Sequence, residues 1–255
     1  MNMDPLYLVL SVPALLLSMV FSAKVKSTFA KYSKVGAASG MTGAEAAATM
    51  LSRAGVNDVM IRKISGVLTD HYNPADNTLN LSPEVYEGRS LSSLGVACHE
   101  AGHALQKATG YKWMGVRSAL VPAANLGSKF SYVVFAIGLA MVAANPADPA
   151  AGAAAAGAAA SGTAGLGWLL VKAGIVLFTG AVAFSVVTLP VEWDASARAK
   201  RQLVACGMLS PEEESGAASV LNAAFMTYVA AAVSSLMTLL YFLLRSGLLG
   251  GGRRR

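Results

Sequence analysis

Residues 98–104, which read Cys-His-Glu-Ala-Gly-His-Ala, constrain this chain more than any other stretch. His99 and His103 are four residues apart, so on a helix their side chains lie one above the other and can reach a single metal ion. Glu100 lies beside the first histidine, where its carboxylate can accept a proton from a water held by that metal. The pattern His-Glu-x-x-His on a helix therefore predicts a zinc site with Glu100 as general base.

The residues around this pattern predict a mostly buried helix from about Leu91 to Ala108. Ser90 or Ser92 can cap its first turn, and Gly110 is placed to follow its C-cap. Most other positions of this helix are apolar, and a buried pair of imidazoles without partners would be costly to hold there. We therefore favour two metal ligands over the alternative of two core histidines satisfied by hydrogen bonds.

The composition is that of a membrane protein. The chain is 55% hydrophobic and only 13% charged, and its mean hydropathy is +0.52, well outside the range of an ordinary soluble domain. The candidate spans are residues 6–23, about 119–144, 166–189 and about 224–244. Asp4 rather than a basic cluster precedes the first span, so we expect this span to be retained as an anchor.

Positive charge predicts the orientation of these spans. Eleven lysines and arginines lie between residues 24 and 118, whereas residues 145–165 contain none. The first of these segments should face the cytoplasm and the second the outside. The same bias accounts for the net charge of +6, and because no basic-aromatic recognition motif accompanies it, we expect no nucleic-acid partner.

A catalytic zinc site usually has three protein ligands and one open position, so one more ligand must come from elsewhere in the chain. The choice is between His71 and a carboxylate. Glu192 and Asp194 lie where the third span meets the cytoplasm, at the expected start of a helix that runs to about residue 205. The predicted topology places these two acids on the same side of the membrane as the histidine motif.

Each of these residues keeps an alternative role. In the favoured arrangement Glu192 is the third ligand and Asp194 accepts a hydrogen bond from a ligand histidine. Alternatively, both acids stabilise a helix N-terminus and pair with Arg198 or Lys200. His71 is the fallback ligand, and its setting among turn residues also suits a substrate-contacting or a purely structural role.

The segment between the first two spans is long enough for a small domain. Thr42 and Glu45 form a potential capping box for a helix over about Gly43–Arg53, ended by Gly55. Extended segments are expected at 59–64 and 66–69, a turn at 70–77 and a strand at 78–81. The edge of this last strand could pair with an extended peptide substrate.

Taken together, these residues resemble the YugP-like neutral zinc metallopeptidases, which are membrane-bound bacterial proteins with a His-Glu-x-Gly-His helix. The resemblance is carried by residues 70–74, 79–82, 85–90, 97–106 and 189–196. That family is similar to the gluzincin membrane proteases of the heat-shock type, which add a glutamate ligand from a later helix. The resemblance implies peptidase activity, with His99, His103 and Glu192 as metal ligands and Glu100 as base. The heat-shock proteases have a Glu-x-x-x-Asp spacing after the glutamate ligand, which this chain replaces with Glu192-Trp193-Asp194.

The sequence therefore predicts a mainly α, multi-span helical membrane protein with a small α+β, zincin-like cytoplasmic domain that carries the motif helix. We expect an integral-membrane metalloendopeptidase of the cell membrane, with one Zn²⁺ per chain, protein or peptide substrates and a role in membrane protein quality control. A homo-oligomer is compatible with this prediction. The alternatives are a membrane scaffold or regulator with a structural or silent zinc site and, less favoured, a hydrolase of non-peptide substrates. The expected segments are an anchor at 1–23, the catalytic region at 24–118, a transmembrane hairpin at 119–189, a cytoplasmic helical segment at 190–223, and a last span with a basic tail at 224–255.

Overall fold

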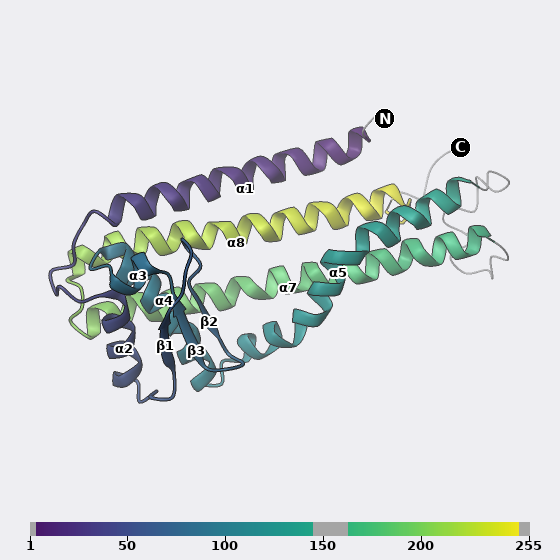
Figure 1. The fold of residues 1–255 in the computed structure, drawn as a ribbon. Coiled ribbons are helices and arrows are strands. Elements are labelled where there is room, and N and C mark those ends of the chain that lie inside the picture. The colour runs from purple at the N-terminus through teal and green to yellow at the C-terminus, as the bar shows by residue number, and fades with distance from the viewer. Residues whose placement is uncertain (1–3, 145–162, 250–255) are drawn as a thin grey trace. The chain divides into compact units, whose positions relative to one another are not determined.

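The computed structural model describes residues 4–144 and 163–249. Most of the external loop expected at 145–165, and the basic tail at the C-terminus, lie outside the described residues. Within these described ranges, four helices are long and apolar enough to cross a membrane, in agreement with the four candidate spans of the sequence. These helices are α1 (Pro5–Tyr32), α5 (Lys112–Ala143), α7 (Thr163–Ala205) and α8 (Pro211–Arg245) (Figure 1).

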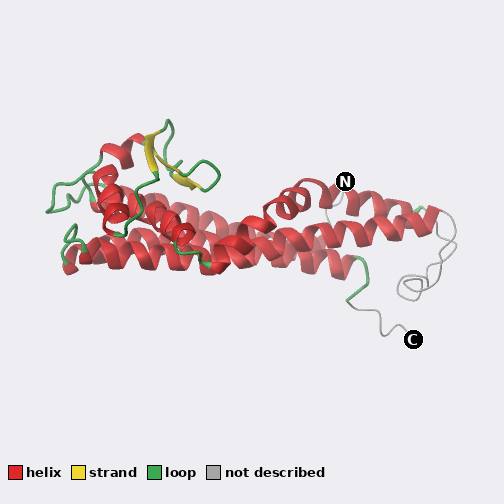
Figure 2. Cartoon of the chain, turned by 90° about the horizontal axis from the view of Figure 1, so that it is seen from below, coloured by secondary structure: helices red, strands yellow, loops and turns green. Residues whose placement is uncertain are grey.

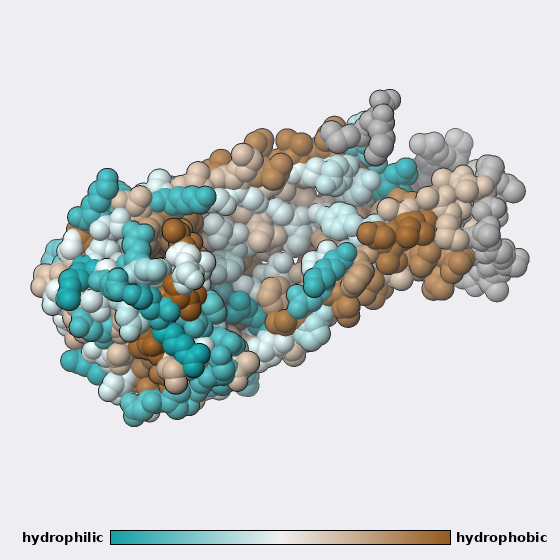
Figure 3. Space-filling model, in the orientation of Figure 1, coloured by the Kyte–Doolittle hydropathy of each residue, from teal (hydrophilic) through white to brown (hydrophobic). Residues whose placement is uncertain are grey.

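The rest of the described chain forms shorter helices and one small sheet, so the protein is mainly helical (Figure 2). The helices are α2 (Gly43–Arg53), α3 (Pro83–Glu87) and α4 (Leu91–Ala108), and the strands are β1 (Met60–Lys63), β2 (His71–Asn73) and β3 (Thr78–Leu81). Hydrophilic residues gather over the sheet and these short helices (Figure 3). Hydrophobic residues are instead exposed along the long helices, as in α1, where Val9 is 69% and Val20 62% exposed. Lipid tails would cover such side chains.

The chain divides into two compact units. The apolar unit comprises residues 1–17, 118–186 and 231–255, and the motif unit comprises residues 18–117 and 187–230. In the apolar unit, Phe135, Phe178 and Phe242 form an aromatic core between α5, α7 and α8. The close approach of α5 and α7 depends on small residues, because a Cβ on Gly174 would lie only 2.8 Å from the Cβ of Phe135.

Both predicted helix starts in the motif unit are confirmed. Ser90 caps α4, since its Oγ accepts a hydrogen bond from the backbone N–H of Ser93 at 3.1 Å. Ser92, the other candidate, instead donates its hydroxyl to the backbone oxygen of Phe29. Thr42 and Glu45 form the reciprocal capping box of α2. These caps satisfy backbone donors that have no partner within the helix.

The sheet differs from the prediction in three places. Residues 65–68 form a bend, so the extended segment expected at 66–69 is absent; Gly66 and Leu68 have positive φ angles of 115° and 54°. His71–Asn73, expected within a turn, is the strand β2. The strand order is β1-β3-β2, with β1 parallel and β2 antiparallel to β3. Both edges of β3 are therefore occupied, so the expectation that its edge pairs with a substrate is wrong.

Helix α7 is continuous through Pro190, which lies inside it. The expectation that a new helix opens near this proline is therefore wrong, and neither Glu192 nor Asp194 stabilises a helix N-terminus. An internal proline removes a backbone donor, but helices that cross membranes tolerate it where neighbouring groups compensate. The hydroxyl of Tyr111 also donates to the backbone oxygen of Pro190 at 3.3 Å, a contact that holds α7 at this point but does not replace the missing donor. As a result, one helix includes both an apolar span and the two acids.

Candidate metal centre

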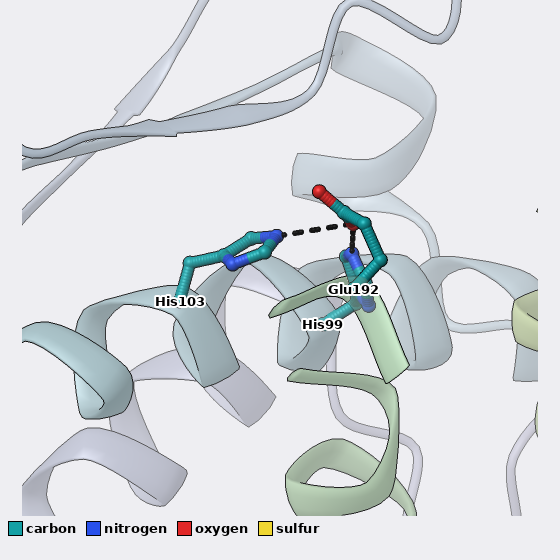
Figure 4. A group of neighbouring side chains, drawn as sticks. All are labelled: His99, His103 and Glu192. Carbon is teal, nitrogen blue, oxygen red and sulfur yellow. Dashed lines mark hydrogen bonds and ion pairs between the residues drawn. The ribbon is translucent and has the colours of Figure 1, made fainter. Parts of the chain in front are cut away.

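The structure brings together the three residues that the sequence proposed as ligands. His99 and His103 project from α4, and Glu192 projects from α7 toward both imidazoles (Figure 4). Oε2 of Glu192 lies 3.2 Å from Nε2 of His99 and 3.4 Å from Nε2 of His103. One donor atom from each residue lies within 4.8 Å of the others, and the exposed fractions of these side chains are only 11%, 8% and 1%.

The hydrogen bonds around His103 define which of its nitrogens can bind a metal. The side-chain nitrogen of Gln106 donates to the backbone oxygen of Val191 at 2.7 Å and to Asp194 at 2.9 Å, so the amide oxygen of Gln106 faces the imidazole. That oxygen lies 2.9 Å from Nδ1 of His103, which must therefore carry the proton. In neutral His103, Nε2 then presents a lone pair to the Glu192 carboxylate, an arrangement that needs a cation between them.

The electrostatics of the site also favour a positive charge. Burial alone would lower the pKa of the His103 imidazole, but the hydrogen bond to Glu192 and the negative charge of Glu192 raise it above its ordinary value. Without a metal, a proton would occupy the place that two imidazole nitrogens and a carboxylate oxygen provide. These donor types are the ones that Zn²⁺ takes in catalytic sites with three protein ligands. The residues present therefore fit a zinc ion.

The second oxygen of Glu192 is oriented by Arg117. Oε1 of Glu192 is buried and has no hydrogen-bond partner among the described residues. Nη2 of Arg117, near the start of α5, lies 3.6 Å from it. A guanidinium at this distance offsets part of the cost of burying the carboxylate. Oε2 is thereby left to face the histidines.

Glu100 is oriented by the edge of the sheet. Its Oε2 accepts the backbone N–H of Tyr72 in β2 at 3.0 Å. Glu100 lines a cavity of about 240 Å³ together with His99, Glu192 and Asp70. Burial raises the pKa of the Asp70 carboxyl, hydrogen bonds from Ser82 counteract this rise, and the charge of Glu100 adds to it. The base candidate and two of the ligand candidates therefore face the same space.

Asp194 and His71 do not contact the site as expected. Oδ2 of Asp194 accepts hydrogen bonds from Gln106 and, at 2.6 Å, from Arg198, so Asp194 reaches His103 only through Gln106. The expected direct hydrogen bond from a ligand histidine to Asp194 is therefore absent from the described contacts. His71 is exposed in β2, and its Nδ1 lies 2.9 Å from the backbone oxygen of Thr69. His71 is not part of the cluster of ligand candidates.

Several residues that the sequence analysis did not single out complete the site: Gln106, Ser196, Arg117, Tyr72 and Tyr228. Gln106 and Ser196 could have been found by spacing, because each lies three or four residues after a ligand candidate on the same helix face. Ser196 places its hydroxyl 3.1 Å from Nδ1 of His99. The others come from different elements, and their contribution follows only from the tertiary fold.

Comparison with known proteins assigns the chain to a family. A family model described as "Putative neutral zinc metallopeptidase" matches residues 7–247. The chain is also 41% identical over 239 residues to the "Putative membrane protease YugP" of Bacillus subtilis strain 168, covering 94% of this chain and 96% of that protein. No solved structure matches. The chain therefore belongs to this neutral zinc metallopeptidase family, as its sequence motifs predicted.

Replacing Gln106 with leucine is expected to weaken zinc binding by about 10- to 100-fold, because the group that fixes the His103 imidazole is lost. Gln106 is fully buried, and the change also leaves the backbone oxygen of Val191 without this donor. Chelator competition on the purified protein measures the zinc affinity. Gln202→Leu on α7 is the matched control, since among the described residues the side chain of Gln202 hydrogen-bonds only to Cys206. Equal zinc affinity of the two variants would contradict the role given to Gln106.

Gly102→Ala is expected to lower the free energy of unfolding by about 1–3 kcal/mol, as overpacking does, and to weaken zinc binding. A Cβ at this position of α4 would lie 2.7 Å from the backbone oxygen of Ala195 in α7, so the two helices that hold the ligand candidates must separate. Thermal unfolding with and without zinc measures both effects. At Gly115 a Cβ would meet nothing within 4 Å, so Gly115→Ala is the control and should be neutral or slightly stabilising.

Proposed function

We propose that this protein is an integral-membrane zinc-dependent metalloendopeptidase that hydrolyses peptide bonds in protein or peptide substrates. The observation that carries this proposal is the joint placement of His99, His103 and Glu192 around one position, with Glu100 on the same cavity. Membership of the zinc metallopeptidase family supports it. A purely structural zinc site would usually be closed by four protein ligands, and the cluster offers three.

Each residue has a separate role in this proposal. His99, His103 and Glu192 would hold the zinc ion, which supplies Lewis acidity toward a water molecule and the substrate carbonyl. Glu100 accepts the proton of the attacking water and passes it to the leaving amine. The backbone N–H of Tyr72 orients the Glu100 carboxylate for these transfers. Gln106 and Ser196 orient the imidazoles, and Asp194 acts only by fixing Gln106.

We further propose that residues 24–118 and 190–223 form a zincin-like, gluzincin-type catalytic region on the cytoplasmic side of the cell membrane. Residues 1–23, 119–189 and 224–255 would then form the anchor, the transmembrane hairpin and the last span with its tail. The concentration of basic residues in 24–118 supports this orientation. A catalytic site at the end of membrane helices suits substrates that are themselves membrane proteins, as quality control would require.

Cleavage of an unfolded protein such as casein tests the proposed activity. The zinc-loaded protein is compared with the same preparation stripped by a chelator and then reloaded, and metal content is measured for each. Cleavage that is lost with zinc and regained with it supports the peptidase. A protein that binds zinc but cuts neither casein nor membrane protein substrates would instead support the scaffold or regulator.

A further inference from the structure

The lining of the cavity beside Glu100 is mostly apolar, apart from the catalytic groups at one side. Apart from the ligand candidates and Glu100, its lining contains mainly aliphatic and aromatic side chains. The polar exceptions are Asp70, Ser196, Thr227 and Tyr228. Both carboxylate oxygens of Asp70 accept hydrogen bonds from Ser82, so this acid is already satisfied by the protein. The cavity therefore has an apolar side that the proposed chemistry does not use.

Helices α1 and α8 form this apolar side. Val25 and Phe29 lie four residues apart on one face of α1, and Leu221, Ala224 and Phe225 lie on one face of α8. Phe29 and Leu221 are buried. Both helices are candidate membrane spans. Val96 of α4 and Leu68 of the loop before β2 complete the apolar side, which is therefore built mainly by two candidate spans.

The lysines of α1 favour a position for this pocket near the membrane surface. Lys24, Lys26 and Lys31 of α1 alternate with the residues that line the pocket. Such residues near the end of a span extend their charges toward the headgroups and water. An extended segment of a membrane protein at this level could reach both the pocket and Glu100.

The size of the cavity leaves room for a side chain and not only for a single water. Its volume is about 240 Å³, whereas an engineered apolar cavity of roughly 150 Å³ binds benzene. A phenylalanine, leucine or methionine side chain would fit, whereas an acidic side chain would lose its hydration and meet the carboxylates of Asp70 and Glu100.

We infer that this pocket binds a large apolar side chain of the substrate residue next to the scissile bond. This inference rests on the proposed peptidase function and names its substrate class, which is extended segments close to the membrane with an aromatic or branched aliphatic residue at the cut. Moving such a side chain from water into an apolar pocket favours it over alanine by roughly one to two orders of magnitude in affinity or kcat/KM.

Binding to the zinc-loaded Glu100→Gln protein in lipid nanodiscs tests the pocket without requiring turnover. Three fluorescent peptides are compared. They consist of alanine and serine except at one position, which is phenylalanine, alanine or aspartate. We expect the phenylalanine peptide to bind about tenfold or more tightly than the other two. Equal affinities for the three peptides would overturn the inference.

A substitution within the pocket tests whether the residues that line it cause the preference for phenylalanine. Adding Ala224→Phe fills the pocket, so affinity for the phenylalanine peptide should fall by about tenfold or more while that for the alanine peptide changes little. Asn222→Phe is the matched control, because Asn222 is exposed on the same helix and does not line the cavity. If both substitutions leave the preference for phenylalanine intact, the pocket is not the binding site.

The cleavage sites in casein separate this inference from the proposed function. The wild-type protein should cut casein next to large apolar residues on one side of the scissile bond, and Ala224→Phe should redirect the cuts to small residues. This pair of results would support both the peptidase function and the pocket. Cuts without any such bias would overturn the inference and leave the peptidase standing. Phenylalanine-dependent binding without any cleavage would overturn the proposed function and leave the pocket assigned.

Discussion

Replacing Glu100 with glutamine is expected to lower kcat/KM for peptide hydrolysis by about two to four orders of magnitude. Glutamine has nearly the same shape but cannot accept the proton of the attacking water. Its side-chain oxygen can still accept the backbone N–H of Tyr72, so the position of the side chain should be preserved. Zinc content should not change, because Glu100 is outside the ligand cluster. Casein cleavage and metal analysis on the same preparation measure both quantities.

Glu84→Gln is the matched control for this experiment, because Glu84 is an exposed glutamate in α3. It should leave both activity and zinc content at the wild-type level. Full activity of the Glu100→Gln protein would remove Glu100 from its role as base. Loss of zinc in the same variant would mean that Glu100 supports the metal centre instead.

Replacing His103 with alanine is expected to remove zinc from the protein and, with it, all measurable hydrolysis. Only two of the three ligand candidates would remain, so the loss in affinity should exceed the roughly 10- to 100-fold that accompanies removal of an outer partner. The variant also leaves Glu192, which is 1% exposed, with one fewer partner for its buried charge. Metal analysis after dialysis against a weak chelator, together with thermal unfolding, measures both effects.

His71→Ala is the control that distinguishes a ligand histidine from a surface one. His71 is exposed and bonded to the backbone of Thr69, so its removal should keep zinc and stability near the wild-type values. If His71→Ala loses zinc and His103→Ala retains it, the assignment of the metal centre is wrong. Modest loss of activity with intact zinc in His71→Ala would instead indicate contact with the substrate.

Local sequence signals were sufficient for the helices of the motif unit. The Ser90 cap, the Thr42 and Glu45 box, and the bounds of α4 follow from backbone donors that a neighbouring side chain must satisfy. The four apolar spans follow from the length of helix needed to cross a bilayer. Such features depend on residues close together in the chain, and each of these local patterns fits few alternative structures.

The errors arose where distant parts of the chain meet. The pairing of β3 on both edges depends on β1 and β2, and nothing in residues 78–81 specifies either neighbour. Pro190 suggested a helix boundary, but α7 continues through it. The side chains around the ligand candidates show the same limit, because Arg117 and Tyr72 reach the site only through the tertiary fold.

The unbroken course of α7 also determines how this protein can be handled. A recombinant fragment limited to residues 24–118 would contain both histidines and Glu100, but it would lack Glu192 and the backbone oxygen that orients Gln106. Extending the fragment to include Glu192 brings in part of a helix that is apolar enough to cross a membrane. It would also still need the residues of α8 that line the cavity. Since every complete version of the site includes membrane helices, assays, inhibitor screens and crystallisation all require the whole chain in a bilayer or a substitute for one.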